Sequence, residues 1–260
     1  MSPCRVAVIT GAASGIGRAA VELFVARDCG VVAVDQHADA FEWAAALDNV
    51  VCLGGDVSDE ATNAAAVSAA LEHWGRLDVA VLNAGIVGSP GFESEGAIDR
   101  LDRVLAVNVR GVALGIRHCV AAIRATGADG AIVATASTSG FGGDPGNWAY
   151  NASKAAVINL VRAAALDYAA QGIRVNAVAP GPTDTGMTAA LQRLPEVHHA
   201  MARRVPMQRW GAPSELAEAI WFLASPAASF ITGVTLAVDG GLSANAGHFD
   251  LPELPPRPTM

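Results

Sequence analysis

Lysine is nearly absent from this chain. Of the 17 lysine and arginine residues in 260 positions, only Lys154 is a lysine, and there are only two tyrosines. Lys154 follows one of those tyrosines, Tyr150, by four positions in the stretch 148-WAYNASKAAV-157. Because arginine replaces lysine everywhere else, we expect Lys154 to be present for the chemistry of its ammonium group.

Charged residues and cysteines are also scarce, and both shortages exclude classes of function. Charged residues make up 16% of the chain and the net charge is −8, which disfavours nucleic acid, anionic membranes and acidic carrier proteins as partners. The four cysteines form no CxxC pair and no metal-ligand spacing. We therefore expect no metal site and a reducing, cytoplasmic location.

The sequence has one long uncharged run, 219–238, and no secretory signal. About 20 apolar residues could span a bilayer. However, Pro226 lies in the middle of the run and Gly233 interrupts the remainder. We predict a helix that ends near Ala224, a turn and a buried strand at 234–238, and no membrane partner.

Short apolar runs alternate with longer helical segments along the chain. The valine-rich runs predict strands covered on both faces, at 6–10, 31–35, 50–53, 78–83, 131–137, 173–180 and 234–239. Helical periodicity predicts helices that include 15–28, 59–74 and 151–171. This alternation is typical of an α/β protein with a Rossmann-like, doubly wound parallel sheet of about seven strands and helices on both faces. We expect a single domain over 1–250, and an irregular, proline-rich tail at 251–260 that could strap across a neighbouring subunit.

A glycine-rich segment, 10-TGAASGIG-17, joins the first predicted strand to the first predicted helix. Gly11, Gly15 and Gly17 have the spacing G-x3-G-x-G, a variant of the dinucleotide-binding fingerprint that lets a backbone approach a pyrophosphate. Asp35 ends the second strand eighteen residues later, where a carboxylate accepts hydrogen bonds from ribose hydroxyls and repels a 2′-phosphate. The alternative is that Asp35 caps a turn. We favour the ribose contact, and hence NAD(H) over NADP(H).

Two further segments lie where strands are expected to end. Asp56 follows the third strand and could lie beside the adenine amino group or cap the helix that starts near Asp59. The sequence leaves these two roles open. The segment 83-NAG-85 ends the fourth strand, where ligands bind in folds of this class.

Tyr150 and Lys154 are expected on one face of a helix, one turn apart. A nearby ammonium favours the phenolate, so Lys154 is expected to lower the pKa of Tyr150 and allow it to act as a general acid and base. Ser137 ends the fifth strand, where a hydroxyl can bind a substrate oxygen, although Thr138 and Ser139 are rivals. Asn108 lies in an apolar helical run and either holds a water or faces solvent.

These motifs together resemble the short-chain dehydrogenase/reductase family, in its compact one-domain branch, from Thr10 to Asp239. The resemblance implies that Tyr150 is the general acid/base, that Lys154 holds the nicotinamide ribose, and that Ser137 positions the substrate oxygen. It implies a water relay through Asn108, an NAD cofactor and a homotetramer or dimer. Of Thr183 and Thr185, we favour Thr185 as the contact to the nicotinamide amide. The implied cofactor-binding residues are Gly11, Ser14, Gly15, Ile16, Gly17, Asp35, Asp56, Val57, Asn83, Ala84, Gly85, Tyr150, Lys154, Pro180, Gly181, Thr183 and Thr185.

Substrate contacts are expected from three loops, 86–97, 138–149 and 182–212. The apolar residues there predict an adaptable, hydrophobic pocket or, alternatively, side chains that pack under a lid: Phe141, Trp148, Met187, Leu191, Leu194, Met201, Met207 and Trp210. Arg203, Arg204 and Arg209 could bind a carboxylate but are expected to face solvent, and His198 and His199 are interpreted as loop residues. The predicted function is an NAD-dependent dehydrogenase of a small or medium, hydrophobic or alicyclic secondary alcohol. The alternatives are a 3-oxoacyl-carrier-protein reductase and a non-catalytic nucleotide-binding sensor.

Overall fold

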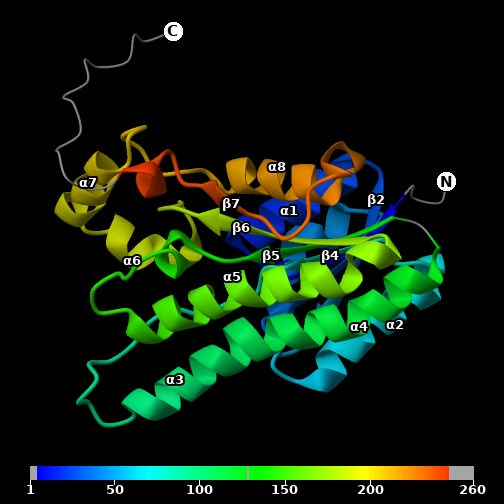
Figure 1. Cartoon of the computed structure of the whole chain (residues 1–260), viewed down its shortest axis with the longest axis horizontal. Helices are drawn as coiled ribbons and strands as arrows, with labels where there is room; N and C mark the ends of the chain where they lie inside the picture. Colours follow the sequence, from blue (N-terminus) through cyan, green and yellow to red (C-terminus); the bar gives the residue numbers. More distant parts are fainter. Residues whose placement is uncertain (1–4, 128, 246–260) are drawn as a thin grey trace, which may run out of the picture.

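A single seven-stranded parallel sheet forms the centre of the molecule (Figure 1). The computed structural model describes residues 5–127 and 129–245, so the predicted 251–260 tail lies outside the described residues. The strand order is β3-β2-β1-β4-β5-β6-β7, with every neighbouring pair parallel. The sequence therefore winds outwards from β1 in both directions, and the predicted doubly wound sheet is confirmed. The strands are β1 Arg5–Thr10, β2 Cys29–Asp35, β3 Val50–Gly54, β4 Val79–Leu82, β5 Gly130–Thr135, β6 Ile173–Pro180 and β7 Thr235–Val238.

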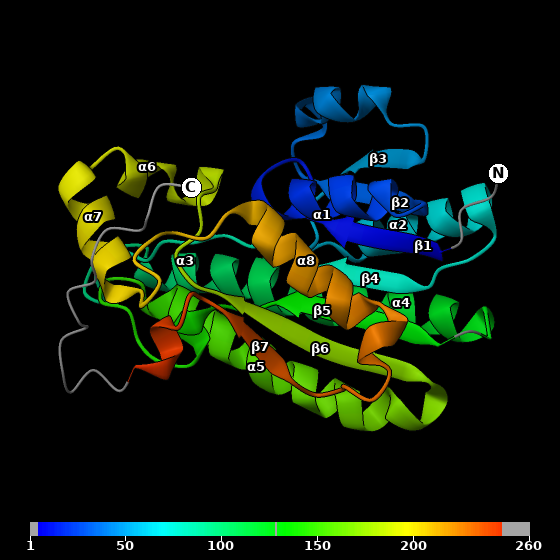
Figure 2. The same ribbon diagram turned by 90° about the horizontal axis from the view of Figure 1, so that it is seen from above.

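Helices cover both faces of this sheet (Figure 2). One face carries α1 (Gly15–Ala26) and α8 (Pro213–Ala224), and the other carries α2 (Glu60–Trp74), α4 (Gly111–Ala125) and α5 (Trp148–Tyr168). Alternate residues of each strand enter opposite cores. Val6 and Val8 pack on the side of α2, α4 and α5, whereas Ala7 and Ile9 pack on the side of α1 and α8. Burial on both faces explains the continuous apolar runs.

The two edge strands depart from the prediction of full burial. In β7, Leu236 and Ala237 are exposed, and in β3, Cys52 is exposed. The expectation of a buried strand at 234–238 is therefore wrong. An apolar run predicts a strand, but it does not reveal whether the strand has a neighbour on each side. β7 pairs only with β6, and β3 only with β2.

The uncharged run 219–238 divides as predicted, because α8 ends at Ala224 and β7 begins at Thr235. Another segment, Ala97–Ala125, is long and apolar enough to cross a membrane, and it contains α3 (Ala97–Leu105), a π-helical turn at Ala106–Arg110 and α4. This is a weak indication, because buried core helices pass the same test. In this chain 56% of its most apolar window is buried inside the molecule.

Two short helices, α6 (Ala189–Gln192) and α7 (Pro195–Arg204), lie at the end of the molecule towards which the carboxyl ends of the strands point, whereas the helical segment after β2 lies beside β3 (Figure 2). The segment after β2 is Ala38–Ala46, while α6 and α7 follow β6. The single turn Thr138–Gly140 follows β5, and α5 then begins at Trp148, three residues earlier than predicted. Tyr150 and Lys154 therefore both lie within the first two turns of α5.

Candidate active site

The glycine-rich loop between β1 and α1 has the shape of an anion cradle. A Cβ built on Gly17 would lie 2.0 Å from the carbonyl oxygen of Gly11, so only glycine allows this approach. Ser14 is the N-cap of α1, is exposed, and makes no side-chain cap hydrogen bond. The first turn of α1 also contains no acidic residue. The amide groups at this helix start are thus left for an external anion, which fits the pyrophosphate of a dinucleotide.

A small cavity of about 70 Å³ lies beside this loop and brings together residues from separate motifs. Six of the predicted cofactor-binding residues line it, namely Gly11, Asp35, Asp56, Val57, Ala84 and Gly85. Four lining residues were not predicted, namely Gln36, Gly55, Ile86 and Val107. Their only sequence signal is that each adjoins or closely follows a predicted motif residue.

The carboxylate of Asp35 caps a turn and also lines the small cavity. Its Oδ1 accepts a hydrogen bond from the amide of His37 at 3.1 Å, so it caps a turn. Its Oδ2 accepts from the amide of Ala13 in the glycine-rich loop at 3.1 Å. The same carboxylate lines the small cavity. The hydrogen bonds that cap the turn therefore keep the carboxylate of Asp35 at the edge of the small cavity.

Asp56 does not cap the helix that follows it. Helix α2 begins at Glu60 with Asp59 as its N-cap, and Asp56 instead accepts hydrogen bonds from the amide and hydroxyl of Ser58 at 2.8 and 2.7 Å. Arg103 forms an ion pair with it at 2.5 Å. Burial acts to raise the pKa of Asp56, but the hydrogen bonds from Ser58 and Arg103 outweigh it and lower that pKa. An ionised carboxylate can accept a hydrogen bond from an exocyclic amine.

The side-chain amide of Asn83 stabilises the site through hydrogen bonds to three neighbouring residues. Its Nδ2 donates to the carbonyls of Thr10 and Gly11 at 3.1 and 3.3 Å, and its Oδ1 accepts from Thr135 at 3.0 Å. The side-chain amide is therefore already engaged with three neighbours. Asn83 ties the ends of β1, β4 and β5 together and fixes the glycine-rich loop, a role that its spacing alone did not predict.

The segment after β6 presents its two threonines differently. Thr183 is buried and donates a hydrogen bond to the carbonyl of Gly181 at 2.9 Å. Thr185 begins the turn Gly186–Thr188 and lies across from the glycine-rich loop, where a Cβ built on Gly15 would come within 3.2 Å of it. Of the two, Thr185 is therefore the one placed against the dinucleotide loop. Pro180 and Gly181 connect this segment to the end of β6.

Lys154 is buried next to Tyr150. Its side chain is 3% exposed, its Nζ donates to the carbonyl of Thr135 at 2.7 Å, and it lies 5.5 Å from the centroid of the Tyr150 ring. Burial lowers the pKa of Lys154 from 10.5 to about 8. A Cβ on Gly85 would lie 3.4 Å from Nζ, so the glycine lets the backbone run close to the ammonium.

The pKa of Tyr150 departs from the sequence-based expectation. Burial raises it, a hydrogen bond with Ser137 lowers it, and the charge of Asp144 raises it, with a net shift upwards. The prediction that the chain itself lowers this pKa is therefore wrong. The cause is desolvation of the phenolate, which exceeds the opposing effects. The phenol of the protein alone is protonated at neutral pH.

The hydroxyl of Ser137 forms a hydrogen bond with Tyr150, whereas those of Thr138 and Ser139 bind other groups. Thr138 donates to the carbonyl of Pro180 at 3.3 Å, and Ser139 donates to the carboxylate of Asp144. The Ser137 hydroxyl donates in turn to that of Ser139 at 3.2 Å. Ser137 thus lies between the phenol and a second polar group.

Asn108 does not face solvent. It is fully buried in the π-helical turn, where its Oδ1 accepts from the amide of Ile86 at 2.8 Å and its Nδ2 donates to Ser153 at 2.9 Å. A Cβ on Gly85 would lie 3.3 Å from its Oδ1, as well as near Lys154. Single π-turns within α-helices are frequent at functional sites, because they displace the normal hydrogen-bond ladder.

The predicted substrate loops contain both exposed and packed apolar residues. Trp210 is buried and stacks on His198 at 4.6 Å, so it belongs to the support of the loop and not to an open pocket wall. His198 and His199 lie in α7, which corrects their assignment to a loop. Trp148 stacks on the exposed ring of Phe92 at 4.3 Å. The exposed apolar residues of these loops are Phe92, Phe141, Met187, Leu191, Leu194, Val197 and Met207.

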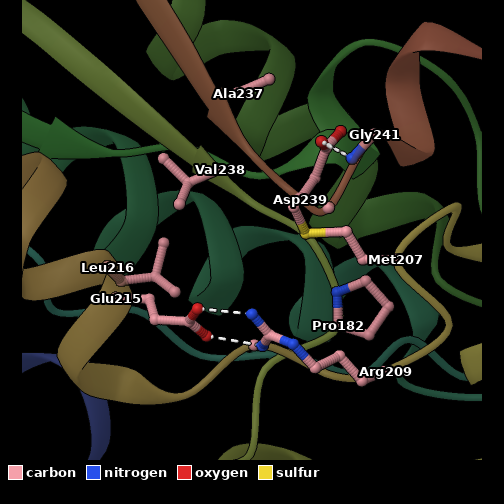
Figure 3. Close-up of a pocket in the computed structure, with 11 residues that line it drawn as sticks. Pro182, Met207, Arg209, Glu215, Leu216, Ala237, Val238, Asp239 and Gly241 are labelled. Carbon is pink, nitrogen blue, oxygen red and sulfur yellow. Dashed lines mark hydrogen bonds and ion pairs between the residues drawn. The ribbon is translucent and has the colours of Figure 1, made fainter. Parts of the chain in front are cut away.

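Of the three arginines of this region, two are exposed and one is paired with a carboxylate of the chain itself. Arg203 and Arg204 are exposed, and Arg209 forms an ion pair with Glu215 at 2.6 Å. That pair borders a cavity of about 350 Å³ beyond the ends of β6 and β7 (Figure 3). Asp239 also borders it, with its carboxylate bound to the amide of Gly241. None of Ser137, Tyr150 and Lys154 lines this cavity, so its size does not make it the reaction site. Within residues 5–127 and 129–245, no group of three or more metal-binding side chains is present.

Comparison with known proteins agrees with this geometry. The family model described as enoyl-(acyl carrier protein) reductase matches residues 11–243. The chain is 40% identical to 2-(R)-hydroxypropyl-CoM dehydrogenase of Xanthobacter autotrophicus over 92% of this chain and 99% of the relative. It is 45% identical to cis-4-hydroxycyclohexanecarboxylate dehydrogenase of Sinomonas cyclohexanicum, with 92% and 97% covered. The crystal structure of 3-ketoacyl-(acyl-carrier-protein) reductase from Brucella melitensis complexed with NADH superposes with a TM-score of 0.86 at 36% identity, covering 94% of this chain and all of that one.

Proposed function

The chain belongs to the short-chain dehydrogenase/reductase family, and from that premise we propose that it is an NAD(H)-dependent enzyme with Tyr150 as its general acid and base. It interconverts secondary alcohols and ketones, as its dehydrogenase relatives indicate. The observation that carries the residue assignment is the buried Lys154 ammonium at 5.5 Å from the Tyr150 ring, with Ser137 hydrogen-bonded to the same phenol.

The cradle of the glycine-rich loop and the small cavity support a bound dinucleotide. Gly17 and the uncapped start of α1 would hold its pyrophosphate, Asp35 and Asp56 its adenosine, and Thr185 its nicotinamide amide. The bound cofactor would accept or supply the hydride of the reaction. NAD is favoured over NADP because the carboxylate of Asp35 would repel a 2′-phosphate, and the structural relative complexed with NADH is consistent with this choice.

The protein's own residues account for the movement of the proton. In the direction of ketone reduction, the protonated phenol of Tyr150 donates to the oxygen that gains charge, and the Ser137 hydroxyl holds that oxygen. In the direction of oxidation, Tyr150 receives the proton of the alcohol. Lys154 lies where a positive charge stabilises the phenolate that each cycle forms. Asn108 and Gly85 shape the space around the ammonium.

Asp35→Ala is expected to narrow the preference for NAD over NADP. The change removes the charge that opposes a 2′-phosphate, and it also removes the acceptor for the amides of Ala13 and His37. Asp35→Asn keeps the shape of the side chain and serves as a second variant. The ratio of kcat/KM for the two cofactors and their Kd values measure the effect. An unchanged ratio in both variants would show that Asp35 does not contact the ribose.

The substrate is proposed to be a small to medium, hydrophobic or alicyclic secondary alcohol or its ketone. Support comes from the exposed apolar residues of the loops, including Met187, Leu191 and Phe141. The name of the relative cis-4-hydroxycyclohexanecarboxylate dehydrogenase is consistent with a ring-bearing alcohol.

A 3-oxoacyl-carrier-protein reductase is the second candidate. The structural likeness to the Brucella melitensis reductase favours it, whereas the net charge of −8 opposes binding of an acidic carrier. A non-catalytic sensor is less well supported, since Ser137, Tyr150 and Lys154 are all present and assembled.

A panel of alcohols with NAD⁺, followed by absorbance at 340 nm, separates these functions. We expect reduction of NAD⁺ with apolar or alicyclic secondary alcohols. Activity confined to acyl thioesters would favour the carrier-protein reductase, and tight NADH binding without turnover would favour the sensor.

We also propose that the enzyme is a single domain over 1–250, is cytoplasmic and forms a homotetramer or dimer without membrane or nucleic-acid partners. Cys52 and Cys119 are free thiols, which is consistent with a reducing compartment. Large apolar side chains are exposed on two helical faces, with Leu166 on α5, Phe222 on α8 and Phe230 just after it. A second copy would bury them.

A further inference from the structure

A chain of hydrogen bonds leads from the Ser137 hydroxyl away from the reaction site. Ser137 donates to the hydroxyl of Ser139 at 3.2 Å and accepts from the amide of Ser139 at the same distance. The Ser139 hydroxyl donates to the carboxylate of Asp144. Ser137 and Ser139 are buried, whereas Asp144 is exposed in the turn before α5. The chain therefore connects a buried hydroxyl at the reaction site to a charge at the surface.

The turn that carries Asp144 is fixed to the helix that carries the phenol. The side chain of Asn151 donates from its Nδ2 to the carbonyl of Asp144 at 2.9 Å, and Asn151 directly follows Tyr150. Ser139 thus binds the carboxylate itself, while α5 binds the backbone of the turn that carries it. An ionised carboxylate can only accept hydrogen bonds, so it fixes the direction in which the Ser139 hydroxyl points.

We propose that Asp144 is a positioning residue that holds the Ser137 hydroxyl through Ser139 until a substrate oxygen replaces Ser139 as the acceptor of its proton, and that Asp144 also sets the pH range in which the proposed alcohol–ketone reaction runs. The inference rests on the proposed function of Ser137 and Tyr150. Neither the spacing of the tyrosine and lysine nor the glycine-rich loop pointed to this residue.

The charges around the phenol determine whether removal of Asp144 raises or lowers the pKa of Tyr150. Lys154 of α5 lies 5.5 Å from the Tyr150 ring, and the charge of Asp144 also acts on the phenol. Arg100 of α3 is turned towards the carbonyls of Val87 and Gly88 in the neighbouring loop. A negative charge near a phenol disfavours the phenolate, so Asp144 raises the pKa of Tyr150 and its removal lowers that pKa.

The test compares Asp144→Asn with Asp167→Asn in the holoenzyme. Asp167 lies on α5, seventeen residues after Tyr150, and is exposed, so both variants change the net charge from −8 by one unit. Oxidation requires the phenolate, so we expect the acidic limb of kcat/KM for alcohol oxidation to move to lower pH in Asp144→Asn alone. Asp144→Glu restores the charge and is expected to return the limb towards the parental position.

Ser139→Ala separates the hydrogen-bond chain from the charge. We expect kcat to fall by about 2- to 10-fold, as the loss of one hydrogen bond implies, with KM and the Kd for NADH little changed. If the profile of Asp144→Asn coincides with that of Asp167→Asn, or if Ser139→Ala matches the parent, the proposal is wrong. If the parent itself oxidises no alcohol on the panel, the proposed function fails instead, so the two failures are distinguishable.

Discussion

Tyr150→Phe is expected to lower kcat by about 10²- to 10⁴-fold, the range typical for loss of a general acid or base. The change removes only the phenol oxygen and its hydrogen bond with Ser137, and leaves the ring on α5. The Kd for NADH, measured by fluorescence, is expected to stay within a few-fold of the parent, because the dinucleotide cradle comes from the glycine-rich loop and the small cavity.

The matched control is Tyr168→Phe, which removes the only other phenol of the chain, at the far end of the same helix. We expect this variant to retain activity. Retained turnover in Tyr150→Phe would remove the phenol from the mechanism, whatever the behaviour of the control.

Lys154→Arg is expected to lower kcat by a similar factor and also to weaken NADH binding. The ammonium occupies a closed space, 3% exposed, bounded by Gly85, Asn108 and the carbonyl of Thr135. A planar guanidinium is larger, carries its donors in a fixed fork and remains charged at every accessible pH. It can therefore neither fit this space nor reproduce the contacts of a compact ammonium.

Arg162→Lys on the exposed face of α5 is the reverse exchange and serves as the control for helix stability. Lys154→Met separates size from charge, since methionine fits but carries no ammonium. Parental kcat in Lys154→Arg would show that any cation suffices, and parental kcat in Lys154→Met would show that no cation is needed.

The sequence predicted the elements that depend on local patterns. The apolar runs gave all seven strands to within a few residues, and the four-residue spacing placed Tyr150 and Lys154 on one helix face. Gly11 of the glycine-rich segment and Asp35 line one cavity. The elements could be predicted because hydrophobic period and turn chemistry are encoded within short stretches of chain.

The predictions that failed depend on distant neighbours. The direction of the shift in the pKa of Tyr150 follows from its burial in the folded chain, and the exposure of β7 follows from its place at the sheet edge. Trp210 is buried because α7 places His198 against it. The engagement of Asn83 with β1 and β5 is likewise invisible until the strands are assembled.

The most direct measurement exploits the scarcity of tyrosine. In a Tyr168→Phe background, incorporation of 3-fluorotyrosine alters only residue 150 and lowers the pKa of its phenol, because fluorine withdraws electrons. If Tyr150 exchanges the proton with substrate, the pH profile of kcat/KM for alcohol oxidation must shift to lower pH relative to the same variant with ordinary tyrosine. A profile that does not move would contradict the assignment of Tyr150 as the general acid and base.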